Sequence, residues 1–320
     1  MGSEGDGPAK KGKSRFSRTL AADRPRRLPP DEWFPAGVDG IRVRRVALSS
    51  GYDLRVLEAG TDSSAPPLLL MHGWAVSSYL WRHNILPLAA AGHRVICVDI
   101  PGHGQSSTPT ARDSYTLASL ARMVAQLLDT LGIERASILA QSMAGKFAVR
   151  FALDAPERAD QLLLFGPVGF GDTPPWRVLA PVLPPLPGAL PSLLIPRSLV
   201  GFVQNRVQGK LGWFTQRDID EYWAPSQFPD VVRAQLRMLK QFDWNPWDEE
   251  TLRRLRTPTL VVFGTRDRTV RPVHAERLAS ALPNGRLEWI HDGGHVVMEE
   301  APDRVNALII KTLRERRTAD

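Results

Sequence analysis

Residues 139–145 read Leu-Ala-Gln-Ser-Met-Ala-Gly and place a serine between an apolar, strand-like stretch and a helix-like one. A serine at such a junction is held on a sharp turn, so that its hydroxyl group stands clear of the sheet. The usual pattern of this turn is Gly-x-Ser-x-Gly, and Ala140 and Ala144 stand where the two glycines are expected. Because alanine adds only a methyl group, we interpret the segment as a nucleophile elbow centred on Ser142.

A serine hydroxyl group is a poor nucleophile at neutral pH. It needs a base within hydrogen-bond distance and a third group that orients the base. Two later segments offer these groups: the apolar run 259–263 leads into a turn with Asp267, and the run 286–290 leads into a Gly-Gly loop with His295. The chain therefore supplies Ser, Asp and His in that order, each near the end of an apolar run.

The elements that position these residues follow from the periodicity of apolar side chains. Near-continuous apolar runs are typical of strands buried on both faces of a parallel sheet, and helix-like patterns lie between them. This alternation predicts an α/β fold with a mostly parallel, doubly wound sheet. The expected strands are 67–71, 94–98, 137–140, 161–165, 259–263 and 286–290, after a hairpin of 41–48 and 54–58; the expected helices are 116–131, 143–153, 274–282 and 301–313.

Taken together, the elbow, the two later residues and their order resemble the α/β-hydrolase fold superfamily over residues 38–315. The similarity is to its lid-bearing serine hydrolases, a group of esterases, C–C hydrolases and epoxide-hydrolase-like proteins. It implies that Ser142 is the nucleophile, that His295 is the general base and then the general acid, and that Asp267 orients His295.

The alternation of strand and helix breaks between two core strands. Residues 173–197 contain eight prolines among Leu, Val and Ile, and helix-like stretches follow. The apolar run 178–203 is too rich in proline for a membrane-spanning helix, so we expect a helical lid with an apolar underside instead. The predicted organisation is a lid of residues 168–251 inserted in a hydrolase core of residues 36–167 and 252–320.

Tryptophans are concentrated in this insertion, which holds five of the nine in the chain. As a group they predict an apolar cavity beneath the lid. We expect Trp176, Trp213 and Trp223 to contact the substrate.

Hydrolysis at a carbonyl group also requires hydrogen-bond donors for the oxyanion that forms. The segment Met-His-Gly-Trp at 71–74 resembles the oxyanion turn of the superfamily. The resemblance implies that the backbone N–H groups of Trp74 and Met143 form the oxyanion hole, that Gly73 allows close approach of the main chain, and that His72 is structural. Asp99, in a loop that resembles a recurrent turn of lid-bearing members, is also expected to be structural.

The residue at the elbow selects among the activities of the superfamily. Relatives that form alkyl-enzyme esters from epoxides or haloalkanes carry aspartate there, whereas Ser142 would form an acyl-enzyme. We therefore expect a hydrolase of carboxylic esters or thioesters with a small to medium apolar substrate. The same residues also suit a C–C bond hydrolase of dienoic or β-diketone compounds, an acyltransferase or perhydrolase, or a pseudoenzyme that only binds an apolar ligand.

The net charge of +7 gives little support to other functions. Residues 1–30 hold eight basic and three acidic residues, which accounts for +5 of this charge. We expect residues 1–35 to form a disordered basic tail and expect no nucleic-acid partner. The tail has no apolar signal sequence, and the one cysteine, Cys97, lies in an apolar run, so a cytoplasmic protein is predicted. No Cys and His cluster has metal-ligand spacing, and we expect neither metal nor cofactor.

Overall fold

The computed structural model describes residues 28–61, 65–171 and 195–318. Their centre is an eight-stranded sheet with the order β1-β2-β4-β3-β5-β6-β7-β8. Strand β2 is antiparallel to β1 and to β4, and all other neighbours are parallel. The predicted α/β class with a mostly parallel sheet is confirmed. The strands are β1 (Arg42–Ala47), β2 (Asp53–Ala59), β3 (Leu68–Met71), β4 (Val95–Val98), β5 (Ala136–Gln141), β6 (Ala159–Phe165), β7 (Thr259–Gly264) and β8 (Gly285–Ile290).

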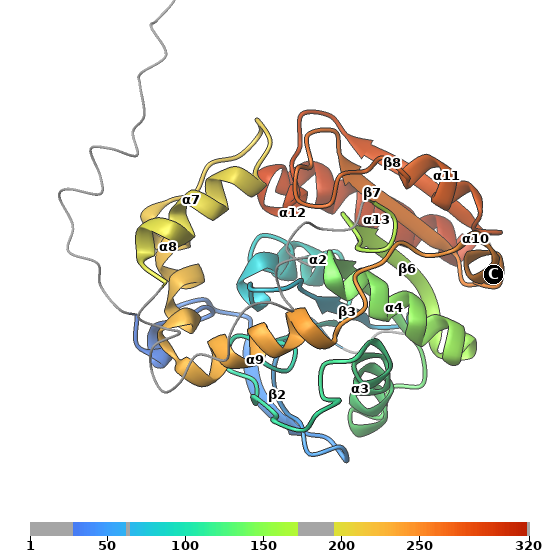
Figure 1. Cartoon of the computed structure of the whole chain (residues 1–320). Helices are drawn as coiled ribbons and strands as arrows, with labels where there is room; N and C mark the ends of the chain where they lie inside the picture. The colour runs from blue at the N-terminus through green and yellow to red at the C-terminus, as the bar shows by residue number, and fades with distance from the viewer. Residues whose placement is uncertain (1–27, 62–64, 172–194, 319–320) are drawn as a thin grey trace, which may run out of the picture.

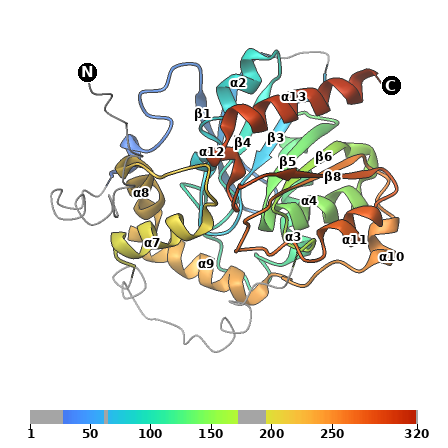
Figure 2. The same cartoon turned by 90° about the horizontal axis from the view of Figure 1, so that it is seen from above.

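Helices cover both faces of the sheet (Figure 2). Successive side chains of a strand point to opposite faces, so Leu69 and Leu70 of β3 belong to two separate apolar clusters. The cluster around Leu69 includes side chains of α3 (Leu117–Thr130), α4 (Met143–Asp154), α10 (Glu249–Arg253) and α11 (Ala275–Ser280). The cluster around Leu70 includes side chains of α2 (Ile85–Ala90), α12 (Val297–Glu300), α13 (Pro302–Thr318) and the 3₁₀ helix η2 (Ser78–Trp81).

Strand β8 differs from the expectation of a strand buried on both faces. It is the last strand of the sheet, and of its six residues only Ile290 is buried. Arg286 and Glu288 of this edge strand are exposed. The alternation of polar and apolar residues in 286–290 is typical of a half-buried strand.

Between β6 and β7, where the sequence predicts an insertion, the described residues form three helices ahead of α10. They are α7 (Arg197–Val207), α8 (Gln216–Trp223) and α9 (Pro229–Gln241), with the 3₁₀ turn η5 (Ala224–Gln227) between the last two. Figure 1 shows them in yellow and orange on one side of the molecule. The proline-rich part of the expected lid lies mostly outside the described residues. No described helix is both long and apolar enough to cross a bilayer.

Residues 28–35 correct one part of the expected organisation, because they are folded rather than part of a disordered tail. Leu28 and Trp33 are buried with Ala224 of η5, and the Trp33 indole donates to the carbonyl oxygen of Leu28 at 2.9 Å. The N–H of Phe34 donates to Glu221 Oε1 of α8 at 2.9 Å. The apolar side chains of Leu28, Trp33 and Phe34 supply this burial. Residues 1–27 lie outside the described part of the chain.

Candidate active site

Ser142 lies on a strained turn between β5 and α4, as an elbow requires. Its backbone has φ 54° and ψ −118°, a conformation that costs a residue other than glycine about 1 to 3 kcal/mol. Hydrogen bonds hold it there: the Ser142 N–H donates to Phe165 O at 2.9 Å, and Ser142 O accepts the N–H groups of Gly145 and Val168, each at 3.0 Å. The adjoining strand and helix therefore fix the position of the Ser142 side chain, which is nearly buried.

The alanines beside the elbow are packed in the core of the protein. Ala140 and Ala144 are fully buried, and both belong to the apolar cluster around α3 and α4. The close contact between the elbow helix and its neighbours lies one residue after Ala144, at Gly145. A Cβ atom added to Gly145 would lie 2.6 Å from Pro167 Cβ. The glycine that this elbow needs on its helical side is therefore Gly145.

Asp267 and His295 are joined by a short hydrogen bond. Asp267 follows β7, His295 follows β8, and Asp267 Oδ2 lies 2.7 Å from His295 Nδ1. Asp267 Oδ1 accepts the N–H groups of Thr269 at 2.8 Å and Val270 at 3.0 Å, which orients the carboxylate. An ionised Asp267 requires the proton of His295 to be on Nδ1, which leaves Nε2 free to accept a proton.

Two contacts bring this pair to the elbow. The side chain of Gln141, which precedes Ser142, donates to the carbonyl oxygen of His295 at 3.3 Å. Gly166 directly follows Phe165, the residue that accepts the Ser142 N–H. A Cβ atom on Gly166 would lie 3.0 Å from both Asp267 Oδ2 and His295 Nδ1. The three predicted residues are therefore gathered at the carboxyl ends of β5, β7 and β8.

Gly166 is a site residue that the sequence analysis missed. It has a positive φ of 52°, and its missing side chain leaves room for the Asp267 and His295 pair. A glycine after an apolar strand is common in loops, so nothing in the sequence distinguishes Gly166 from other loop glycines.

The loop after β3 lies against the elbow, as expected from Gly73. A Cβ atom on Gly73 would lie 2.8 Å from Ser142 Cβ and 2.3 Å from Gln141 Oε1. The next residue, Trp74, donates its indole N–H to Gln235 O of α9 at 3.1 Å. Met143 is the first residue of α4, so its N–H has no acceptor within the helix. These positions are compatible with the predicted oxyanion hole of Trp74 and Met143 N–H groups.

Two buried histidines hold this loop in place. His72 Nε2 accepts the Ile100 N–H at 3.0 Å, and its Nδ1 lies 2.8 Å from Gly73 O. His103 Nε2 accepts the Ala75 N–H at 3.0 Å. Burial lowers the pKa of His72, and burial is the main cause that lowers the pKa of His103 to about 3. Both rings are therefore neutral near pH 7, as their acceptor roles require.

Asp99 has structural contacts of the kind we expected. Its carboxylate pairs with Arg55 at 3.1 Å and accepts the N–H groups of Ser78 and Gln105. Burial by itself would raise the pKa of Asp99, but the Arg55 guanidinium and these donors lower it below its ordinary value. Asp99 therefore fixes the loops around β4.

Of the three tryptophans expected to contact substrate, the structure describes Trp213 and Trp223. Trp176 lies outside the described residues. Trp213 is 81% exposed in the loop after α7, a position that gives an apolar ligand no enclosure. Trp223 of α8 is buried and donates its indole N–H to Ile195 O at 2.9 Å. The number of tryptophans in the insertion predicted neither the exposure of Trp213 nor the burial of Trp223.

Glu300 of α12 connects the loop of His295 to the segment after α7. Its carboxylate accepts the Gly294 N–H at 2.9 Å and the Gly209 N–H at 2.8 Å. The two segments touch so closely that a Cβ atom on Gly294 would lie 2.3 Å from Gly209 N. The sequence analysis missed this residue because its partners are distant in the chain.

Lys146 makes a second connection, between α4 and the segment after α9. It is buried one helical turn after Ser142, and its ammonium group lies 2.8 Å from Asp243 Oδ2 and 2.5 Å from Asn245 O. It also lies 5.0 Å from the ring centre of Trp247. These contacts compensate the burial of the charge and fasten the end of the insertion to the elbow helix.

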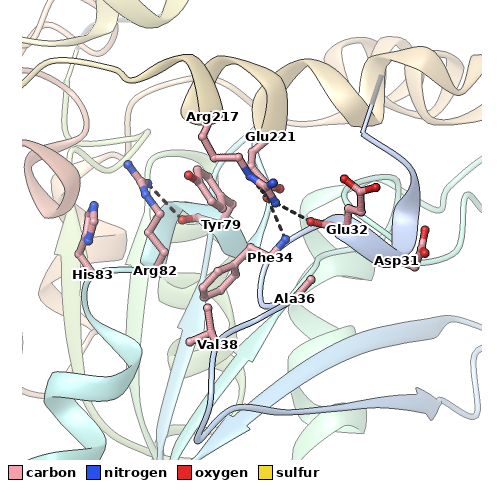
Figure 3. A pocket seen from close by; sticks show the side chains of 10 residues that line it. All are labelled: Asp31, Glu32, Phe34, Ala36, Val38, Tyr79, Arg82, His83, Arg217 and Glu221. Atoms are coloured by element: carbon pink, nitrogen blue, oxygen red, sulfur yellow. Dashed lines mark hydrogen bonds and ion pairs between the residues drawn. The ribbon is translucent and has the colours of Figure 1, made fainter. Parts of the chain in front are cut away.

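A pocket of about 590 Å³ lies away from these residues, between residues 31–38, η2 and α8 (Figure 3). Both arginines that line it are already paired: Arg217 pairs with Glu221, and Arg82 pairs with Asp218 and Glu299. We therefore assign no catalytic role to this pocket. Among the described residues, no three His, Cys, Asp or Glu side chains are gathered to hold a metal ion.

Comparisons with known proteins agree with this fold. A sequence model described as "alpha/beta hydrolase fold" matches residues 66–302. The dihydrolipoyllysine-residue acetyltransferase component of the acetoin cleaving system of Cupriavidus necator is 32% identical, over 87% of this chain and 68% of that protein. A 2-hydroxy-6-oxononadienedioate/2-hydroxy-6-oxononatrienedioate hydrolase of Burkholderia vietnamiensis is 31% identical, over 83% of this chain and 93% of that protein. The solved structure of a serine hydrolase involved in carbazole degradation has a TM-score of 0.71 at 21% identity, and the match covers 86% of this chain and 99% of that one.

Proposed function

This chain belongs to the alpha/beta hydrolase fold family, and from that premise we propose that it is a serine hydrolase with a triad of Ser142, His295 and Asp267. The observation that carries the proposal is the 2.7 Å hydrogen bond between His295 Nδ1 and Asp267 Oδ2, next to a serine held at a positive φ. Gly166 adds support, because its lack of a side chain leaves room for that hydrogen bond.

The proposed reaction begins when Ser142 Oγ attacks a carbonyl carbon and passes its proton to His295 Nε2. The N–H groups of Trp74 and Met143 bind the oxyanion of the tetrahedral intermediate, and the N-terminal end of α4 favours this negative charge. His295 then protonates the leaving group, and an acyl group remains on Ser142. Water attacks the acyl-enzyme as His295 takes one of its protons, and His295 then gives that proton to Ser142 Oγ as the acid product leaves.

We assign residues 168–251 as the lid and residues 36–167 and 252–320 as the hydrolase core. Contacts at both ends of the described helices support this division. The Val207 carbonyl at the end of α7 accepts the His295 N–H, and Asp243 after α9 binds Lys146 of the elbow helix. The Trp74 indole reaches Gln235 of α9. The lid thus contacts the loops that carry the nucleophile, the base and the oxyanion donors.

The proposed substrate is a carboxylic ester or thioester of small to medium size with an apolar acyl group. The choice of an acyl-enzyme follows from serine, rather than aspartate, at the elbow. The apolar composition of residues 178–195, where Leu, Val and Pro predominate, supports an apolar acyl group.

A second candidate is the hydrolysis of a carbon–carbon bond next to a ketone. It is favoured by relatives 28–31% identical whose names are those of hydrolases of 2-hydroxy-6-oxo-dienoate compounds. In such a reaction one fragment leaves as a carboxylic acid, and the other takes a proton on carbon. The same three residues would serve it.

A paired assay distinguishes the two candidates. The purified chain is given p-nitrophenyl esters from acetate to decanoate and, separately, 2-hydroxy-6-oxo-6-phenylhexa-2,4-dienoate, with Ser142→Ala as the blank. We expect ester turnover that disappears in the variant. Turnover of the dienoate alone would assign the second candidate, and turnover of neither compound would contradict both substrate classes.

A further inference from the structure

Helix α7 packs Val200 and Val207 against the core but turns three other apolar side chains toward solvent. Leu199, Phe202 and Val203 are 44%, 62% and 45% exposed, and their spacing places them on one face of the helix. On the opposite face Gly201 and Gln204 are buried. A helix that only covers a core shows the reverse distribution, with its large apolar residues inside.

The exposed apolar surface continues into the loop after the helix. Leu211 is 37% exposed and Trp213 is 81% exposed. We call Leu199, Phe202, Val203, Leu211 and Trp213 the α7 patch. Both views place α7 beside α8 at the outer edge of the molecule (Figures 1 and 2), so a large flat partner can reach the patch.

The chain segment that carries the α7 patch has charges of one sign. Residues 195–217 contain four basic residues and no acidic residue. Arg197 binds Asp220, and Arg217 binds Glu221. Arg206 and Lys210 are exposed beside the patch. The carboxylate of Asp292 lies near Lys210, but it already forms an ion pair with the Arg266 guanidinium at 2.5 Å. The patch thus has a positively charged rim.

We propose that the α7 patch binds the surface of a membrane that contains anionic phospholipids. A helix face with Phe, Leu and Val, a neighbouring Trp, and flanking Arg and Lys is the composition that inserts between lipid headgroups. Trp213 in particular is suited to the boundary between water and hydrocarbon. A second copy of the chain fits less well, because symmetric pairing of this face would bring its basic residues together.

Sedimentation with vesicles tests the proposal on the full chain. Vesicles of phosphatidylcholine alone are compared with vesicles that contain phosphatidylglycerol. We expect binding only to the anionic vesicles, weakened by added salt. The double variant Phe202→Ser, Trp213→Ser should lose at least about tenfold in affinity, and Arg206→Gln, Lys210→Gln should bind more weakly with a smaller salt dependence. Val273→Ser is the matched control, because Val273 is also 62% exposed but lies outside the patch.

Tryptophan fluorescence gives a second measurement. The emission should shift to shorter wavelength with anionic vesicles, and Trp213→Phe should remove most of the shift. Equal binding by the wild type and the Phe202, Trp213 double variant would overturn the proposal, since binding would then come from other basic residues. Absence of vesicle binding would also overturn it, as would a dimer that the patch substitutions dissociate.

Discussion

The backbone N–H of His295 donates a hydrogen bond of 2.8 Å to the carbonyl oxygen of Val207, the last residue of α7. Three residues away on each side, the Lys210 N–H donates to Asp292 O at 2.8 Å. The loop of the proposed general base is therefore bound to the insertion as well as to the core. A displacement of α7 would be transmitted to His295 through these backbone hydrogen bonds.

A substitution of Glu300 tests this connection, because its carboxylate accepts hydrogen bonds from both Gly209 after α7 and Gly294 next to His295. In Glu300→Gln only one side-chain oxygen remains, and the amide group would face an N–H donor of Gly209 or Gly294. We expect kcat to fall about tenfold with little change in KM, and the free energy of unfolding to fall by about 1–3 kcal/mol. Ester kinetics and urea unfolding measure the two effects. Glu276→Gln, at an exposed position on α11, should change neither. A stability loss with unchanged kcat would show that Glu300 has no role in positioning His295.

Gly166 offers a separate test of the Asp267 and His295 geometry. Gly166→Ala would place a methyl group 3.0 Å from the two bonded atoms, so we expect kcat/KM to fall about tenfold to hundredfold. Gly132→Ala is the matched control, because Gly132 also has a positive φ, 66°, but nothing lies within 4 Å of an added Cβ atom. Both variants carry the backbone strain of about 1–2 kcal/mol. Equal activity in the two variants would refute the steric role of Gly166.

The burial of His103 predicts that the folded protein loses part of its stability as the pH falls. Its pKa is lowered to about 3 in the folded protein, chiefly by burial, whereas an unfolded chain binds the proton near the ordinary value of 6.5. Between these values the unfolded state binds more protons, so the free energy of unfolding falls as the pH falls, by up to about 1.4 kcal/mol per pH unit. His103→Gln retains an acceptor for the Ala75 N–H and should make the dependence less steep. Urea titrations at pH 7 and pH 5 measure it, and parallel losses in both proteins would rule this cause out.

The sequence predicted the core better than the insertion. Apolar runs such as 67–71 and 137–140 became β3 and β5 because a strand buried on both faces leaves a continuous apolar signal. The motifs at Ser142, Asp267 and His295 are local, and each follows a strand, so their convergence followed from the topology. For Trp213 the sequence carried no such local signal. We expected a substrate contact from the composition of the insertion, but composition does not specify which side chains face solvent.

Gly166 and Glu300 could not be predicted for a different reason. Each acts through contacts with segments that are far away in the chain or that belong to the insertion. The role of Gly166 depends on an atom-scale approach to Asp267 and His295, and that of Glu300 on the meeting of two loops. Such approaches appear only when the elements are placed in space.

Covalent labelling of the serine tests the central claim most directly. The purified chain is treated with a fluorophosphonate probe, and the modified peptide is identified by mass spectrometry. We predict a single adduct on Ser142, no adduct in Ser142→Ala, and full labelling in Ser280→Ala, whose serine lies exposed on α11. Asp267→Asn should slow labelling on the order of 10³-fold, because His295 would lose its orienting carboxylate. Absence of an adduct on Ser142 in the folded wild-type chain, or labelling at the same rate in Asp267→Asn, would contradict the account.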